Sequence, residues 1–452
     1  MPTFLLLFLT FLSSIAAAEQ KPNILFIFAD DMTHEAVGAL GHPEVKTPNI
    51  DRIFQSGTTF THAYNPGAWN GAVCIASRTM LMTGRRLWYA HREKANLDEM
   101  TLWPQHLQKA GYQTYFTGKW HLKTNARRAF QNVGHVRPGM PGDKPHGYNR
   151  PLADRPDPWD PADPQNGGFW AGGKHWSEVE ADTAVRFLKK ATKTPDPFFF
   201  YLAFNAPHDP RQAPQEYLDQ YPAKHLTLPA NFLPANPHRN IMRSPHIVRD
   251  EFLAPLPRTP KAVKTHRAEY FALITHLDAQ IGRVLDALES SGQADNTIVI
   301  FSADHGLAMG SHGLLGKQNP YDHSIRVPLA ISGPGFSTGE KVTHGVYLQD
   351  LVPTTLQLAG APLPENVQFH DVRTADPNRG PIYFGYRDSQ RALVHKNHKL
   401  IHYPRGPVTL LFDLQNDPHE TKNLAPKKPA LTKTLLTLLR QTAKAHGDQL
   451  EF

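Results

Sequence analysis

Residues 23–31 read Asn-Ile-Leu-Phe-Ile-Phe-Ala-Asp-Asp, and this stretch is the most informative about the fold. An uninterrupted apolar run of this kind is typical of a strand buried on both faces of a parallel sheet. The run ends in Asp30 and Asp31, where the carboxyl ends of strands place the ligands of α/β sheets. Two adjacent carboxylates repel each other unless a cation lies between them, and calcium and magnesium prefer such oxygens. A solvated loop or a helix cap would also explain the pair.

Further buried strands are expected in the same part of the chain, and they alternate with helices. The runs at 111–117, 197–204 and 297–301 read as strands, and 102–110 reads as a helix. This alternation indicates an α/β fold. Polar residues follow each of these strands, as Asp30 and Asp31 follow the first, and they include Lys119, His121, His208, Asp304 and His305.

After about residue 370 the sequence pattern changes to short alternating segments. Strands are expected at 382–386, 392–395, 399–402 and 409–413, followed by a basic helix at about 428–445. These elements predict a small antiparallel sheet packed by one helix. The expected organisation is therefore a catalytic domain over 19–370 and a C-terminal subdomain over 371–452.

Cys74 is the only cysteine among the 452 residues. It lies in residues 71–86, Gly-Ala-Val-Cys-Ile-Ala-Ser-Arg-Thr-Met-Leu-Met-Thr-Gly-Arg-Arg. A single thiol is a packed apolar residue, an external crosslink or a reactive centre. We expect Ser77 to cap a helix that runs to Met82 and ends at Gly84, so that Cys74 lies just before a helix N-terminus, where negative charge is favoured.

The order Cys74-x-Ala76-Ser77-Arg78, followed by Thr83-Gly84-Arg85, resembles the signature of the formylglycine-dependent sulfatases of the alkaline phosphatase superfamily. Ala76 stands where the commonest form has proline. The likeness extends over nearly the whole chain and is closest to secreted bacterial polysaccharide and iduronate-type sulfatases. It implies a large mixed, mostly parallel β-sheet between helices, with a smaller C-terminal α+β subdomain. It also implies that a formylglycine-generating enzyme oxidises the cysteine to formylglycine, whose hydrate is the nucleophile.

The resemblance assigns roles to the strand-end residues and to their neighbours. It implies one calcium ion, with the ligands Asp30, Asp31, residue 74, Asp304 and His305. It implies that the sulfate is contacted by Arg78, Lys119 and Lys317, and that protons are moved by His121 and His208. Without the resemblance, Lys119 and His121 would read as a surface lysine beside a half-buried histidine, and His208 as a structural residue.

The implied activity is hydrolysis of sulfate esters, and two other functions share the same residues. A phosphonate or phosphate ester hydrolase of this superfamily could carry the same signature, and a non-catalytic sulfoglycan-binding protein would keep Cys74 as a thiol. The net charge of +7 suits an anionic substrate and favours a sulfated carbohydrate over a small sulfate ester. Basic residues are scattered without a nucleic-acid-binding motif, so no nucleic-acid partner is expected.

The first 18 residues are predicted to be a signal peptide. They form an apolar run that ends in Ala16-Ala17-Ala18, and the run is too short to span a bilayer. No later stretch of the sequence is long and apolar enough for a membrane span. The expected location is therefore periplasmic or secreted.

Two regions are candidates for the rim of the site. Residues 130–172 form a Pro- and Gly-rich insertion in which Trp159, Phe169 and Trp170 either stack on sugar rings or pin the insertion to the body. The C-terminal subdomain is expected to be architectural, with Arg387 or His395 as its contribution to the rim.

Overall fold

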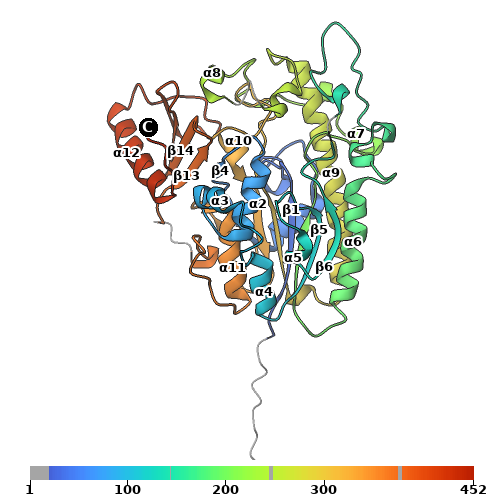
Figure 1. Ribbon diagram of the computed structural model, residues 1–452. Coiled ribbons are helices and arrows are strands. Elements are labelled where there is room, and N and C mark those ends of the chain that lie inside the picture. The colour runs from blue at the N-terminus through green and yellow to red at the C-terminus, as the bar shows by residue number, and fades with distance from the viewer. Residues whose placement is uncertain (1–19, 143, 244–247, 375–378) are drawn as a thin grey trace, which may run out of the picture.

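The computed structural model describes residues 20–142, 144–243, 248–374 and 379–452. The predicted signal peptide, 1–18, lies outside these residues. Figure 1 shows a large central sheet with helices on both of its faces and a C-terminal lobe beside it. Within the described ranges, no helix has the length and apolar character needed to cross a membrane.

The central sheet has eight strands in the order β11-β2-β10-β8-β1-β7-β5-β6. Strand β1 lies between β7 and β8 and is parallel to both, and β5 continues the parallel part to β6. Strand β10 is antiparallel to β8 and to β2. The sheet is therefore mixed and mostly parallel, which confirms the predicted fold class. Its strands are β1 Asn23–Ala29, β2 Gly57–Phe60, β5 Gln113–Lys119, β6 Asn132–Arg137, β7 Phe198–Ala203, β8 Thr297–Ala303, β10 Leu329–Ser332 and β11 Lys341–Val342.

Strand β1 is apolar throughout because both of its faces are covered. Leu25 and Ile27 pack in one core with α1 (Pro48–Ser56), α6 (Trp176–Ala191) and α9 (Pro260–Ser290). Phe26 and Phe28 point to the other core, formed with α2 (Val73–Thr83), α4 (Trp103–Lys109) and α11 (Leu351–Leu358). Each such side chain contributes about 1.5–3 kcal/mol on burial, so this strand anchors both layers.

The C-terminal lobe contains a five-stranded sheet in the order β16-β15-β14-β13-β4. The four predicted strands are antiparallel neighbours, and α12 (Pro429–Ala445) packs on them, as expected. The fifth strand, β4 (Gly67–Ala68), comes from the N-terminal part and is parallel to β13. This short strand was not predicted, and it attaches the lobe to the segment that leads into α2. The other strands of the lobe are β13 Ile382–Tyr386, β14 Gln390–His395, β15 His398–Tyr403 and β16 Val408–Asp413.

A smaller sheet and several short helices complete the described part of the fold. A three-stranded sheet has the order β12-β3-β9. Its strands are β3 Ala63–Tyr64, β9 Arg326–Val327 and β12 Val346–Tyr347. The remaining α-helices are α3 Leu87–Glu93, α5 Ala126–Ala129, α7 Gln215–Leu218, α8 Arg239–Met242 and α10 Asp322–Ile325.

The aromatic side chains of the 130–172 insertion face mainly inward. Phe169 is fully buried in the core beside α6, and Trp159 is 7% exposed. Trp170 is half-buried and its indole contacts the ring of His175. Of the two interpretations, pinning the insertion to the body therefore holds for Phe169.

Candidate active site

The acidic residues of the site meet because the parallel strands β1 and β8 are neighbours and end at the same edge of the sheet. Asp30 and Asp31 follow β1, and Asp304 follows β8. The Asp31 N–H donates to Asp304 Oδ1 at 3.1 Å. Asp31 has a φ of 66°, a left-handed conformation that turns the chain directly after the strand. All three carboxylates are buried.

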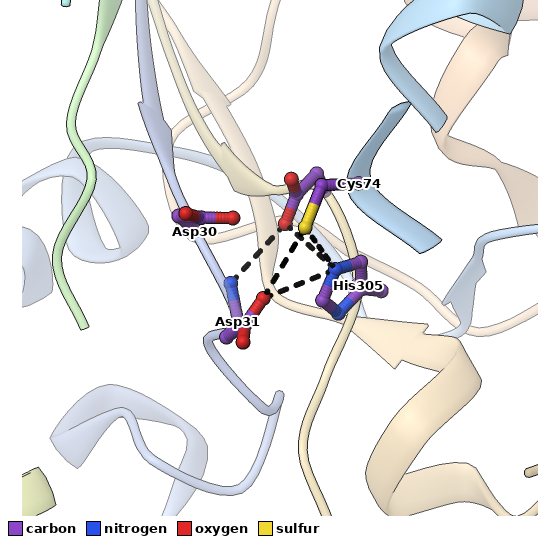
Figure 2. Close-up of side chains that lie close together, drawn as sticks. Asp30, Asp31, Cys74 and His305 are labelled. Atoms are coloured by element: carbon purple, nitrogen blue, oxygen red, sulfur yellow. Dashed lines mark hydrogen bonds and ion pairs between the residues drawn. The ribbon is translucent and has the colours of Figure 1, made fainter. Parts of the chain in front are cut away.

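Cys74 points into this acidic edge from α2. Its Sγ lies 3.2 Å from His305 Nε2, 3.4 Å from Lys317 Nζ and 3.7 Å from Asp31 Oδ1. Figure 2 shows the sulfur, the Asp31 carboxylate and the His305 ring converging, with Asp30 to one side.

The predicted start of α2 was wrong by several residues. The helix begins at Val73, so Cys74 lies inside its first turn and buried Ser77 lies within the helix instead of capping it. The predicted end is confirmed, because Gly84 adopts a φ of 66° and its N–H bonds to the Met80 carbonyl. The consequence for Cys74 survives the correction, since the first turn also favours negative charge.

The surroundings of Cys74 stabilise a negative charge at this position. Burial alone would raise the pKa of the thiol, but the nearby cations Lys119, Lys317 and His305 lower it by more than burial raises it. The net pKa is well below the ordinary value of a thiol. An oxygen anion at the same position would gain from the same cations.

Three basic side chains surround the acids, and each is buried. Arg78 Nε lies 3.1 Å from Asp304 Oδ2, and its Nη1 donates to the Lys119 carbonyl at 2.7 Å. Lys119 forms an ion pair with Asp30, and Lys317 Nζ lies 2.7 Å from Asp31 Oδ2. Every acid thus has at least one lysine or arginine partner, and His305 also lies 3.1 Å from Asp31 Oδ1 and 3.4 Å from Asp304 Oδ1.

These residues also fit a bound cation. Asp30 Oδ1 is buried and accepts no hydrogen bond within the described chain. Burial raises the pKa of Asp30 well above its usual range, and Asp304 and Cys74 raise it further, so more positive charge would be favourable at this point. The possible donors lie within 4.8 Å of one another, and they are Asp30, Asp31, Cys74, Asp304 and His305. Three carboxylates are a donor set that calcium accepts.

Two further histidines face the cluster. His208 Nδ1 lies 2.7 Å from the Asp209 carbonyl oxygen, so Nδ1 carries the hydrogen and Nε2 is left facing Lys317 Nζ at 3.2 Å. His121 follows β5 with a φ of 55°, and its ring packs on Gly139, where a Cβ would lie only 2.5 Å from His121 Nε2. Burial lowers the pKa of His121, which keeps the ring neutral.

The cluster opens into a cavity of about 420 Å³. It is lined by Gly71, Ala72, Cys74, His121, Pro138, Gly139, Met140, His208, Val248, Arg249, Asp250, Lys317 and Gln318.

A comparison with protein-family models identifies this arrangement. The model described as "Sulfatase" matches residues 22–361, which is most of the chain. The chain belongs to the sulfatase family. A second model, described as "N-sulphoglucosamine sulphohydrolase, C-terminal", matches residues 310–445 of this sulfatase. The protein is accordingly a sulfuric ester hydrolase.

Curated relatives match this sulfatase over most of both chains. An ulvan-active sulfatase of Formosa agariphila is 29% identical, over 95% of this chain and 83% of the relative. An N-acetylglucosamine-6-O-sulfatase of Bacteroides thetaiotaomicron is 26% identical, over 99% of this chain and 92% of the relative.

Solved structures share the fold of the sulfatase. One is a protein in complex with its substrate D-glucosamine-2-N,6-O-disulfate. It has a TM-score of 0.74 and 24% identity, over 95% of this chain and 99% of that chain. A phosphonate monoester hydrolase from Silicibacter pomeroyi has a TM-score of 0.73 and 21% identity, over 95% and 96% of the two chains. The fold alone therefore does not distinguish sulfate from phosphonate esters.

The structure places all the residues predicted for the sulfatase site within this one region. These are Asp30, Asp31, Cys74, Arg78, Lys119, His121, His208, Asp304, His305 and Lys317. Of the two rim candidates, His395 lines a different cavity, together with His62 and Lys396. Arg387 packs against Gly71, which lines the active-site cavity, although Arg387 is not itself one of the lining residues.

The sequence analysis missed a second set of polar residues around the cavity. Asp209 forms an ion pair with Arg249, and Arg249 also lies 2.9 Å from Asp250. Gln318 donates to Asp250 Oδ2 at 2.8 Å. The only sequence signals were the position of Asp209 directly after His208 and the position of Gln318 directly after Lys317.

Proposed function

We propose that this sulfatase removes sulfate from a sulfated carbohydrate, with formylglycine derived from Cys74 as the nucleophile and with one calcium ion. The observation that carries the proposal is the position of Cys74 Sγ, which is buried within 3.7 Å of Asp31, His305 and Lys317 and at the wall of a cavity. A residue held there meets both the cation donors and any ligand in the cavity.

The proposed ligands of calcium are Asp30, Asp31, Asp304 and His305 together with residue 74. Hydrated formylglycine would supply a hydroxyl that attacks sulfur, and bound calcium would lower the pKa of that hydroxyl. The low pKa of the Cys74 thiol supports this assignment, because it reflects surroundings that favour a negative charge at residue 74.

The basic residues are proposed to bind the sulfuryl oxygens. Arg78, Lys119 and Lys317 balance the three carboxylates, so a divalent cation would give the cluster a net positive charge. Such a surplus attracts a sulfate ester and stabilises the charge that spreads over its oxygens during transfer. Since all three side chains are already held by buried ion pairs, they need little reorganisation when the substrate arrives.

The two histidines are proposed to move protons. His208 is oriented by its Nδ1–H, so its Nε2 can hold a proton and deliver it to the leaving alcohol oxygen. His121 is neutral because burial lowers its pKa. After transfer, it would accept the proton of the second hydroxyl of residue 74, so that the C–O bond to the sulfate breaks, sulfate leaves and the aldehyde forms again.

A carbohydrate substrate is supported by the relatives. The named ulvan-active and N-acetylglucosamine-6-O-sulfatases act on sugars by their names, and so does the protein crystallised with a glucosamine disulfate. The net charge of +7 suits a polyanionic chain better than a small ester. Export and maturation by a formylglycine-generating enzyme belong to the same proposal.

Mass spectrometry of the tryptic peptide 53–78 from the protein made in its own host tests the nucleophile. We expect the mass of the aldehyde or its hydrate at residue 74. The same preparation should release sulfate from a panel of sulfated oligosaccharides. An unmodified thiol at full occupancy would overturn the formylglycine mechanism and would favour a sulfoglycan-binding protein.

A phosphonate or phosphate ester hydrolase is the second candidate, because the Silicibacter pomeroyi phosphonate hydrolase shares the fold. Matched aryl sulfate, phosphate and phosphonate esters separate the two activities. We expect the largest kcat/KM for the sulfate. A larger value for the phosphonate would assign the protein to the other activity.

A further inference from the structure

Arg387 is brought to the active-site wall by the pairing of β4 with β13. Its backbone N–H donates to the Ala68 carbonyl at 3.0 Å, at the end of this parallel pair. A Cβ built on Gly71 would lie 3.5 Å from Arg387 Nη2, so the guanidinium lies against a residue that lines the cavity. Gly71 lies three residues before Cys74, so Arg387 packs on the segment that leads into the nucleophile position.

Arg387 differs from the other cations around this cavity because its charge has no acidic partner among the described residues. Lys317 is paired with Asp31, and Arg249 is paired with Asp209 and Asp250. Within the described chain, Arg387 forms no ion pair, and its half-buried side chain has a buried Nε that no acceptor bonds. Its guanidinium instead packs near the Tyr386 ring, with 5.7 Å to the centroid.

The backbone of Arg387 is also unusual. Its φ of 45° lies in the left-handed region, which a non-glycine residue adopts at a cost of about 1–3 kcal/mol. A glycine would avoid this cost at the same turn. An arginine without an acidic partner in a strained turn beside the cavity indicates a ligand that supplies the missing charge.

We infer that Arg387 binds a second anionic group of the substrate, a carboxylate or a sulfate carried by the leaving-group sugar. This inference rests on the proposed sulfate ester hydrolysis and names its substrate class as at least doubly anionic. A guanidinium binds either oxyanion through two parallel N–H groups. Arg249 and Asp250 also line the cavity, but they are paired with each other.

Three aryl sulfates test the inference, namely a neutral one, one with a ring carboxylate and one with a ring sulfonate. We expect Arg387→Ala to lower kcat/KM by about 10- to 100-fold for a charged ester and by less than about 3-fold for the neutral ester. A loss of kcat/KM confined to the carboxylated ester means that Arg387 binds a carboxylate. A loss for both charged esters means that Arg387 accepts a carboxylate or a sulfonate. Arg387→Lys should recover part of the loss, because it keeps the charge but not the fork.

Arg440→Ala is the matched control, because it removes one positive charge from the exposed face of α12 in the same lobe. Arg440→Ala should leave kcat/KM unchanged for all three substrates. An equal change of all three by Arg387→Ala, with an unaltered unfolding midpoint, would overturn the inference. If the wild-type protein hydrolyses no sulfate ester, the proposed function fails separately. Calorimetry with the carboxylated ester then decides, because unweakened binding by Arg387→Ala would overturn the inference by itself.

Discussion

Two clusters of buried charge in this sulfatase differ in how completely their charges are paired. The first is the active-site cluster of Asp30, Asp31, Asp304 and their basic partners. The second, here called the junction cluster, comprises Asp322, Lys399 and Glu420 where the C-terminal lobe meets the main domain. Lys399 pairs with Asp322 and lies 2.8 Å from Glu420 Oε1, and Glu420 Oε2 accepts the Asp322 N–H at 2.8 Å.

This difference in pairing indicates that the active-site cluster binds a ligand and that the junction cluster stabilises the fold. In the active-site cluster, Asp30 Oδ1 and Arg78 Nη2 are buried without hydrogen bonds to any described residue. In the junction cluster, Lys399 pairs with two carboxylates from different segments. Glu420 Oε1 also accepts no hydrogen bond from a described residue, but it lies 2.8 Å from the Lys399 ammonium, whereas Arg78 Nη2 lies 3.9 Å from Asp30 Oδ1. Unsatisfied buried charge is costly, and it persists where a ligand supplies the missing partner. The two clusters should therefore respond differently to substitution.

The largest effect is expected at residue 74. Cys74→Ser removes the proposed precursor of the nucleophile, and we expect kcat on an aryl sulfate to fall by about 10⁴-fold or more. The unfolding free energy should change by less than about 1 kcal/mol, because the side chains are similar in size. Steady-state kinetics and urea unfolding measure the two quantities. Retained activity would place the nucleophile elsewhere.

The junction cluster should show the opposite pattern. Lys399→Met leaves Asp322 and Glu420 buried with less positive charge, and we expect a loss of about 3–5 kcal/mol in unfolding free energy. The folded fraction should keep its kcat. Exposed Lys433→Met on α12 is the control and should be nearly neutral. A loss of kcat with unchanged stability would contradict the structural role of the cluster.

Removal of the metal should weaken only the active-site cluster. Dialysis against a calcium chelator is expected to abolish turnover and to lower the unfolding free energy by about 3 kcal/mol, the contribution of a ligand present at 100-fold its Kd. Added calcium should restore both, and the shift should be the same in Lys399→Met because the clusters are independent. An unchanged thermal midpoint in metal-free protein would contradict the proposed cation.

The smallest effect concerns pH and His312, which stacks on Tyr321 next to the junction cluster. Burial lowers the pKa of His312 to about 4, and Lys399 contributes. Since the unfolded pKa is about 6.5, the native state binds fewer protons between these values, so stability is complete above pH 6.5 and is lost as the pH falls towards 4. His312→Gln should reduce the slope in this window by up to about 1.4 kcal/mol per pH unit. Exposed His225→Gln should leave the slope unchanged.

Much of the catalytic edge could be predicted because it depends on local patterns. An apolar run followed by acids places the acids at a strand end, and neighbouring parallel strands end at one edge. This reasoning located Asp30, Asp31 and Asp304 correctly. The predicted start of α2 was wrong because serine is a common capping residue, which favoured a start after Ser77. Instead, packing of the earlier residues continues the helix back to Val73.

The outer part of the site could not be predicted in the same way. The pairs of Asp209 with Arg249 and of Arg249 with Asp250 join the β7 loop to a Pro-rich stretch with no periodicity. Likewise, Arg387 reaches Gly71 only because the two-residue strand β4 pairs with β13. Nothing in either segment alone indicates these contacts.

The sequence by itself determined the α/β fold, the sulfatase resemblance and the residue types available for chemistry, because backbone periodicity and burial act within a segment. Only the tertiary structure decided which lysine neutralises which carboxylate, that Lys399 joins the two lobes, and that Arg387 rather than His395 lies at the cavity. Charge pairing falls off over a few ångströms, and those distances are set by the packing of segments that are remote in the chain.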